Sequence, residues 1–258
     1  MSPGEWSWSP EALLGVALAA AYLLAVRRYP APAWRIACGL AGCALIVIVF
    51  VTPVDTLARR YLVLLHLLQN VVLAEWAPLL LVLAVPPALG AALGGNAAVR
   101  VLTRPFVALP VWIGTYALWH VPALYDAALR RPGWLLVLEH LSYLCTGLAV
   151  WWCVWQDEPH RLPSPARAGY VFAAFVLSAP LGLVLALVPH AIYDFYAGAP
   201  ERAWGLSRLL DQQLGGITMA SEQAVVFFAV FAFWFVRFLA EQDQHELDRL
   251  GTEPPEPG

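Results

Sequence analysis

The chain has 258 residues, of which 60% are apolar and 13% are charged, and its formal net charge is -3. Soluble domains carry about 25% charged residues, so this composition excludes an ordinary soluble protein, and the acidic balance argues against a nucleic-acid-binding one. All 15 basic residues are arginines. The lack of lysine excludes a retinal protein, because the retinal Schiff base forms on a lysine amine.

Seven apolar segments follow one another along the chain. They cover about residues 12–26, 36–51, 61–86, 106–123, 134–155, 168–190 and 214–240. Because about 20 apolar residues in a helix cross the hydrocarbon core of a bilayer, we predict an all-α, seven-helix membrane domain over residues 1–240. An acidic, proline-containing tail, 241–258, follows this domain, and we expect it to be solvated and partly disordered.

The arginines between these segments predict the orientation, since cytoplasmic loops are enriched in basic residues. One set of alternate connectors, together with the tail, carries nine arginines: Arg27, Arg28, Arg35, Arg100, Arg104, Arg161, Arg167, Arg237 and Arg249. The other set carries six: Arg59, Arg60, Arg130, Arg131, Arg202 and Arg208. We therefore predict the N-terminus outside and the C-terminal tail in the cytoplasm.

Four histidines from four segments lie at one depth, near the outer face. His66 is in the third segment, His120 ends the fourth, His140 is in the fifth and His190 ends the sixth. Ionisable side chains inside a membrane are costly, face the bundle interior and mark functional sites. Imidazoles from neighbouring helices can bind a metal or haem, so we predict His66, His120 and His140 as metal ligands. The alternative is a hydrogen-bonding role at the interface, which we favour for His190.

Other polar residues lie at the same level. His66, Gln69 and Asn70 have i, i+3, i+4 spacing, so they share one helix face; such residues could equally well join helices by hydrogen bonds. Asp55 follows the second segment on the outer side, and the run DQQLGG, from Asp211 to Gly216, opens the seventh.

Three further residues are weaker candidates. Glu75 follows His66 by nine residues, which places it on the opposite face of the same helix, and Glu222 lies about two turns beyond Gly215. Either carboxylate could carry a proton or bind a cation. Cys145 lies five residues beyond His140. No metalloprotease, serine-hydrolase, Walker or dinucleotide motif occurs, so we do not expect an enzyme.

Three blocks of sequence resemble a known family. They are TPVDTLARRYLVLLHLLQN, LWHVPALYDAALRRPGWLLVLEHLSYL and LSRLLDQQLGGITM. These blocks are similar to the polytopic CtaG family of cytochrome c oxidase assembly factors, which are associated with caa-type oxidases, and the similarity extends from about Trp6 to Phe238. The resemblance implies a seven-helix bacterial plasma-membrane protein of the respiratory chain. It also implies contact with cytochrome c oxidase subunits and a role at their copper centres.

The positions of this chain that match the family are Asp55, His66, Gln69, His120, Tyr125, Asp126, His140, Asp211, Gln212, Gln213 and Gly215. One departure matters, because family members commonly carry a second histidine where this chain has Asn70. Asparagine is a poor ligand for copper, which favours imidazole or sulfur. A copper site here would therefore combine His66 with ligands from other helices. The sequence MASEQ after DQQLGG also departs from the family and assigns Glu222 to a subgroup.

Two other functions stay open on the sequence alone. A membrane-embedded metal-dependent hydrolase would activate water at the histidines, with Asp55 or Asp211 as ligand or base. A copper or proton transporter would need polar residues that continue inward, for which Glu75 and Glu222 are the candidates. We predict a non-enzymatic assembly factor that holds or passes copper near the outer face, with oxidase subunits and the lipid bilayer as partners and no nucleic acid.

Overall fold

The computed structural model describes residues 2–130, 133–199 and 203–252. Within these ranges the chain is helical and contains no strand. The candidate membrane spans are Ala33–Val51, Val63–Ala84, Trp134–Trp155, Ser164–Leu187 and Arg208–Glu246, and a bent pair of helices makes a sixth. The prediction of an all-α chain is confirmed for the described residues, and five helices, or six with the bent pair, of the seven predicted are long and apolar enough to cross a membrane. The first helix, α1 (Ala12–Arg28), has 17 residues and is shorter than these spans.

The third predicted segment forms the centre of the bundle. It consists of α4 (Val63–Val71), a π-helical turn η1 (Val72–Trp76) and α5 (Ala77–Ala84). This span is the most buried of the five, and α2 (Ala33–Val51), α10 (Trp134–Trp155) and α12 (Arg208–Thr252) pack around it. π-Helical turns occur frequently at functional sites, and this one contains Glu75.

Prolines explain where several helices begin. The first turns of α3 (Pro53–Arg60), α6 (Pro87–Gly94), α8 (Pro105–Trp119), α9 (Pro122–Arg130) and α11 (Ser164–Leu187) each contain a proline, where its missing N–H removes no hydrogen bond. The short helices α3, α6 and α7 (Ala97–Leu102) lie between the predicted segments. The segment predicted at 106–123 was wrong at its end. Helix α8 stops at Trp119 and α9 turns away by 72°, because Pro122 disfavours helical backbone at Val121.

The boundaries of the last two spans also differ from the prediction. Helix α11 ends at Leu187, so His190 lies in the following loop, which contains the short 3-10 helices η2 (Phe195–Gly198) and η3 (Ala203–Gly205). Helix α12 begins at Arg208, so the DQQLGG run lies within its first turns and does not open it. The two helices pack along each other at small residues, and a Cβ added at Gly216 would lie 2.6 Å from the Gly182 carbonyl oxygen.

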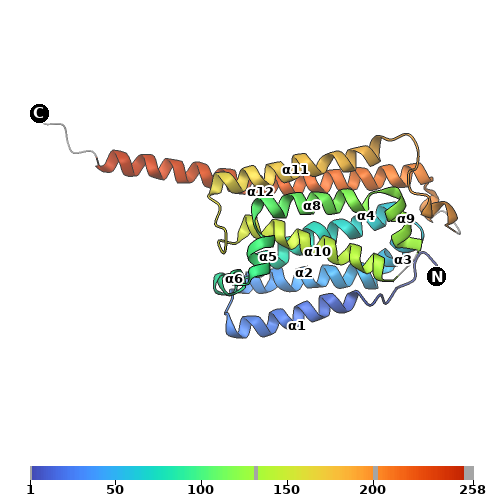
Figure 1. The fold of residues 1–258 in the computed structure, drawn as a ribbon, viewed down its shortest axis with the longest axis horizontal. Helices are drawn as coiled ribbons and strands as arrows, with labels where there is room; N and C mark the ends of the chain where they lie inside the picture. The colour runs from blue at the N-terminus through green and yellow to red at the C-terminus, as the bar shows by residue number, and fades with distance from the viewer. Residues whose placement is uncertain (1, 131–132, 200–202, 253–258) are drawn as a thin grey trace, which may run out of the picture.

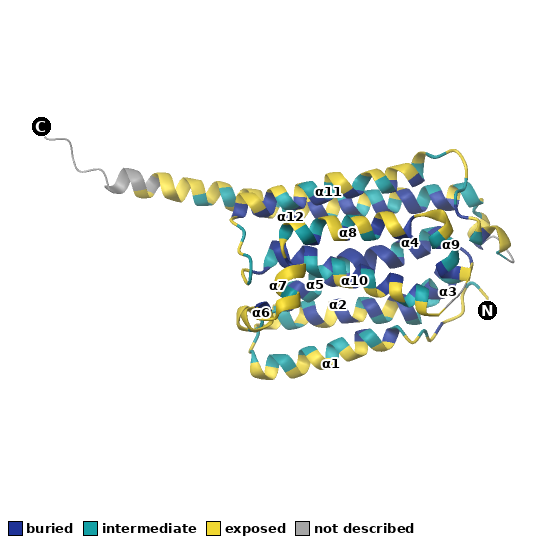
Figure 2. Ribbon diagram, viewed as in Figure 1, coloured by how far each residue is buried: buried dark blue, intermediate teal, exposed yellow. Residues whose placement is uncertain are grey.

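The segment before α1 and the C-terminal end of α12 lie at opposite ends of the molecule (Figure 1). Helix α12 continues past the other helices towards the C-terminus, and its side chains there are exposed (Figure 2). The tail that we expected to be partly disordered is therefore helical from residue 241 to Thr252. Its remaining residues, 253–258, lie outside the described part of the chain, as do Arg131 and Arg202 of the arginine count.

Candidate functional site

The three predicted histidines are all buried at the N-terminal end of the bundle. His66 lies in α4, His120 directly follows α8 and His140 lies in α10. The ring centroids of His66 and His140 are 6.4 Å apart. His120 is held by a hydrogen bond of 2.9 Å between its Nδ1 and the Tyr116 carbonyl oxygen. Three separate helices thus bring imidazoles into the interior, as predicted.

Glu139 lies between these residues. Its Oε1 is 3.2 Å from His66 Nε2 and accepts a hydrogen bond of 2.9 Å from Asn70 Nδ2. Its side chain is fully buried, and it precedes His140 in the sequence. Glu139 was not among the predicted site residues. The available signal was a carboxylate within the apolar segment 134–155, the same signal that selected Glu75 and Glu222. We name Glu139, His66, His140, His120 and Asn70 the histidine group.

A second carboxylate reaches His140 from the N-terminal segment. Glu11 Oε1 lies 3.6 Å from His140 Nδ1 and 2.6 Å from Arg59 Nη2. Burial alone would raise the pKa of Glu11, but the contact with His140 and the charge of Arg59 outweigh burial and lower this pKa to about 2. Glu11 is therefore an anion beside His140. Because Glu11 precedes the first apolar segment, no sequence pattern indicated that it lies near the histidines.

Asp55 has a structural role beside the histidine group. Its carboxylate accepts hydrogen bonds from Ser7, Ser9, Arg59 and Gln69 at 2.6–3.1 Å, and Gln69 also donates to the Val49 carbonyl oxygen. These contacts fasten the segment before α1 to the start of α3 and to α4. Gln69 and Asn70 were predicted on one helix face with His66. Gln69 donates a hydrogen bond to Asp55, whereas Asn70 donates one to Glu139.

The histidine group offers metal-ligating atoms that have no partner in the structure. Buried atoms without a hydrogen-bond partner include His66 Nδ1, His120 Nε2, His140 Nε2 and Glu139 Oε2. A cavity of about 240 Å³, lined by Glu11, Phe50 and His140 among others, adjoins the group. Imidazole nitrogens suit copper, so the donor chemistry matches the expected metal. In the described part of the chain, however, no three His, Cys, Asp or Glu side chains are arranged to hold an ion.

The DQQLGG run positions α4. Asp211 accepts hydrogen bonds of 3.0 Å from the backbone N–H groups of Val63 and Leu64, which are free donors at the start of that helix. Gln212 accepts from the Ile192 N–H at 2.7 Å and donates to the carbonyl oxygens of Leu185 and His190. These two side chains orient the helix that carries His66 and connect it to the loop after α11.

The remaining predicted residues differ in their distance from the histidine group. Tyr125 packs edge-on against His66 at 4.9 Å between ring centroids, whereas Asp126 accepts a hydrogen bond from the Phe195 N–H. Gly215 allows α12 to approach Leu64 and Leu67 of α4. Gln213 is half-buried, while His190 and Cys145 are exposed, so these three do not join the group.

The two deeper carboxylates form a separate polar group, and Glu75 lies away from His66, as its predicted helix face implied. Glu75 Oε1 accepts hydrogen bonds of 2.7 Å from Tyr116 Oη and from Gln223 Nε2. Glu222 accepts one of 2.7 Å from Trp76 Nε1. Tyr116 connects the two groups, because its carbonyl oxygen binds His120 and its hydroxyl group binds Glu75.

Comparison with known proteins identifies the family. A family model described as cytochrome c oxidase caa3 assembly factor (Caa3_CtaG) matches residues 20–241. The chain belongs to this family. The resemblance inferred from the three sequence blocks is thereby confirmed. The match includes His66, His120, Glu139 and His140, whereas Glu11 lies before its start.

The chain is also similar to "Uncharacterized protein ML1998" of Mycobacterium leprae (strain TN). The two are 24% identical over an alignment of 242 positions, and the alignment covers 83% of this chain and 36% of the mycobacterial protein. The chain therefore spans about a third of the length of that relative. No solved structure matches the chain.

Proposed function

We propose that this chain, as a member of the caa3 assembly factor family, contacts nascent cytochrome c oxidase and holds copper as cargo for it at the histidine group. The observation that carries the proposal is the placement of Glu139 within hydrogen-bonding distance of His66, inside a membrane bundle, with free imidazole nitrogens around it. Buried ionisable groups in a membrane are retained where function needs them. The role we propose is non-enzymatic.

The chemistry of the group suits a carrier. Because no three of these side chains are arranged to hold an ion together, one or two imidazoles among His66, His120 and His140 would bind the metal, and the carboxylate of Glu139 would offset its positive charge. Asn70 lies beside Glu139 at the position where family members commonly carry a second histidine, which would be a further metal ligand. An ion held by few protein ligands is released more readily than one in a closed four-ligand site, as transfer to an oxidase subunit requires.

We further propose seven spans with the histidine group on the extracytoplasmic side of a bacterial plasma membrane. The 17 residues of α1 extend about 25 Å at 1.5 Å per residue, near the lower limit for a membrane helix. With α1 and the α8–α9 pair, seven passages place the two ends of the chain on opposite sides, in keeping with their positions in Figure 1. The connectors with nine arginines would face the cytoplasm.

The test measures oxidase activity per molecule of membrane-inserted protein in a deletion strain complemented with variants. His66→Ala, His120→Ala and His140→Ala should abolish oxidase maturation while the protein still accumulates. His190→Ala, which removes an exposed imidazole from the same end, is the matched control and should leave maturation unchanged. If activity falls only in proportion to protein abundance, the histidines stabilise the fold and the copper proposal is wrong.

One observation favours a second candidate, transport of copper or protons. The polar contacts run from His120 through Tyr116 to Glu75 and Gln223, so polar groups continue inward from the histidine group. Transport predicts copper or proton flux into vesicles that contain the purified chain, and loss of that flux in Glu75→Gln. Absence of flux together with a maturation defect in the histidine variants would exclude transport and support the assembly role.

A further inference from the structure

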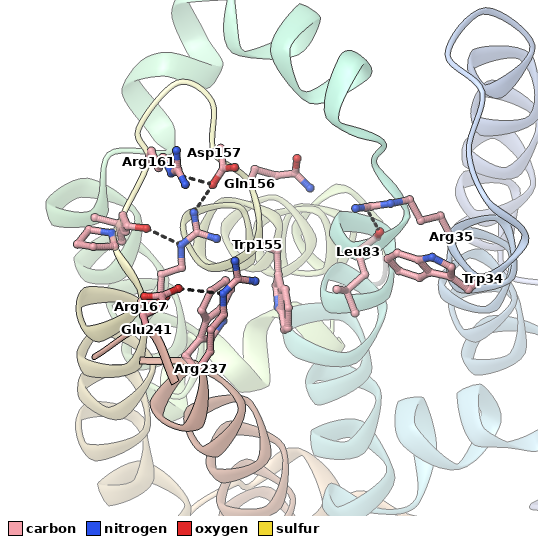
Figure 3. A pocket seen from close by; sticks show the side chains of 14 residues that line it. Trp34, Arg35, Leu83, Trp155, Gln156, Asp157, Arg161, Arg167, Arg237 and Glu241 are labelled. Atoms are coloured by element: carbon pink, nitrogen blue, oxygen red, sulfur yellow. Dashed lines mark hydrogen bonds and ion pairs between the residues drawn. The ribbon is translucent and has the colours of Figure 1, made fainter. Parts of the chain in front are cut away.

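A second polar site lies at the opposite end of the bundle from the histidine group. It is an open pocket of about 620 Å³ among the ends of α2, α5, α10 and α11 and the interior of α12. Its charged lining consists of Arg35, Arg161, Arg167, Arg237, Asp157 and Glu241. Figure 3 shows Arg161, Arg167 and Arg237 on one side of the pocket and Arg35 with Trp34 on the other. We call it the arginine pocket.

Arg167 is fixed in the wall of the arginine pocket. Its side chain is buried, although it carries a full charge at the end of a membrane helix. Nε donates to the Leu162 carbonyl oxygen at 2.8 Å, Nη1 donates to that of Val154 at 3.2 Å, and Nη2 forms an ion pair with Asp157. The guanidinium lies 4.5 Å from the ring centroid of Trp234. This arrangement pre-organises a guanidinium at the pocket surface.

Arg35 contributes a charge that no carboxylate neutralises. Its Nη1 donates to the carbonyl oxygens of Leu83 and Val85 at 2.6 and 2.7 Å, which anchors it at the end of α5. No Asp or Glu in the described ranges forms an ion pair with it, unlike Arg161, Arg167 and Arg237. The lining of the pocket therefore contains four arginines and two carboxylates, so its net charge is positive.

The arginine pocket also contains donors that lack an acceptor. The indole Nε1 atoms of Trp155 and Trp234, which both line it, are buried and have no hydrogen-bond partner in the structure. An unpaired buried donor is unfavourable. A ligand with several anionic oxygens would neutralise the excess charge and accept these hydrogen bonds. Phosphate has this chemistry, and guanidinium groups bind it through paired, planar donors.

We propose that the arginine pocket binds the phosphate group of an anionic phospholipid. It lies where membrane-crossing helices end, a level at which tryptophan is enriched. Apolar side chains beside it are exposed, among them Trp34 on α2 and Phe233 and Val236 on α12, and these provide a surface for acyl chains. Basic pockets between helices on the cytoplasmic side of a membrane bind anionic headgroups. The site is independent of the copper proposal.

The test titrates the purified full-length chain in detergent with lipid and counts bound lipid by native mass spectrometry. Phosphatidylglycerol should bind roughly tenfold or more tightly than phosphatidylcholine. Inorganic phosphate and glycerol 3-phosphate, added as competitors, should displace the lipid only at far higher concentrations. Equal affinity for the two lipids would overturn the proposal. Displacement by inorganic phosphate at concentrations similar to those of the lipid would also overturn it, and would assign the pocket to a soluble anion.

Variants locate the binding. Arg35→Gln combined with Arg237→Gln should weaken phosphatidylglycerol binding about tenfold or more. Arg104→Gln, which removes an exposed arginine at the same end but outside the pocket, should leave it unchanged. Arg161→Gln, in a side chain 77% exposed and therefore harmless to folding, should weaken binding by a few-fold and serves if the double variant does not fold. Retained binding in these pocket variants, or an equal loss in Arg104→Gln, would contradict the assignment.

Discussion

Glu139 determines the electrostatics of the histidine group. A carboxylate inside a membrane bundle is costly unless it is paired, and Oε1 of Glu139 has both His66 and Asn70 as partners. Oε2 has none. The free oxygen and the free imidazole nitrogens are on neighbouring side chains, and because no three side chains of the described residues are arranged to hold an ion, a cation would pair with one or two of these atoms.

The first prediction at the scale of single residues concerns the substitution Asn70→His. Asn70 donates to Glu139, so an imidazole at this position would add a copper ligand next to the carboxylate. The variant should therefore retain more copper per purified molecule than the wild type. Because the larger ring must fit a fully packed site, we expect a cost of about 1–3 kcal/mol in the free energy of unfolding.

The measurement is metal content after purification, determined by mass spectrometry of the elements. Asn70→Gln serves as the control, because it enlarges the side chain without adding an imidazole, and it should show the stability cost but no gain in copper. Equal copper in the two variants would contradict a metal role for this position.

Glu11 gives a prediction about pH. Its pKa in the folded chain is about 2, below the ordinary value of 4.5, because His140 and Arg59 stabilise its anion. Such a carboxylate stabilises the fold above pH 4.5 and loses this contribution as the pH falls towards 2. Thermal unfolding of Glu11→Gln and of the wild type should therefore differ most above about pH 5. This difference should shrink on acidification.

The control for Glu11→Gln is Glu246→Gln, which removes the same charge from an exposed position on α12. It should unfold like the wild type at each pH. A difference between Glu11→Gln and the wild type that grows on acidification would contradict the assigned contact of Glu11 with His140 and Arg59.

The burial of several residues of the histidine group was predictable from the sequence for a physical reason. His66, His120 and His140 were predictable because polar residues in apolar helices face inward, and their common depth followed from helix geometry. Glu11 was not predictable, because a segment outside the helices folds back onto α10 through contacts distant in sequence. Asp55 and Asp211 were selected correctly as polar residues, but their actual roles, fastening the N-terminal segment and capping α4, depend on which helices become neighbours.

At the scale of the elements, η1 and α10 pack exceptionally closely. A Cβ added at Gly147 of α10 would lie 2.1 Å from the carbonyl oxygen of Ala74 in η1. That atom belongs to the backbone of the turn that carries Glu75, so neither partner can move away cheaply. Gly147→Ala should therefore lower the unfolding temperature in detergent, with a cost of about 1–3 kcal/mol.

Gly169→Ala is the matched control for this packing. Gly169 lies inside α11, and a Cβ added there meets no atom within 4 Å. Because alanine favours a helix over glycine by up to about 1 kcal/mol, this variant should unfold at the same or a higher temperature. A similar loss in both variants would mean that the contact between α10 and η1 is not specific.

The helices themselves were predictable to different extents. Helix α10 has the predicted bounds, 134–155, because Gly133 directly precedes its apolar run and the polar residue Gln156 directly follows it. The prediction of one helix over 106–123 took no account of Pro122 and therefore missed the break before α9. The π-helical turn at 72–76 leaves no mark in hydrophobic periodicity, since every residue around it is buried or apolar. The helical start of the tail was missed because composition alone does not distinguish a solvated helix from a coil.

At the scale of the whole molecule, the two ends of the bundle differ in charge. The N-terminal end carries Glu11, Asp55, Glu139 and the histidines, whereas the C-terminal end carries the arginine pocket. If the arginine-rich end faces the cytoplasm, the histidine group faces the opposite compartment. The copper proposal depends on this orientation and the lipid proposal draws support from it, so a single topology measurement bears on both.

The last prediction is that orientation. A reporter that is active only in the cytoplasm, fused after Pro257, should be active, because nine arginines against six bias the C-terminal side inward. The same reporter inserted after Gly198, in the loop between α11 and α12 at the other end of the bundle, should be inactive. A reporter that is active only outside the cytoplasm should give the reverse pattern at both positions. Activity of the cytoplasmic reporter at Gly198 and not at Pro257 would show that the orientation is the reverse of the predicted one, with the histidine group facing the cytoplasm.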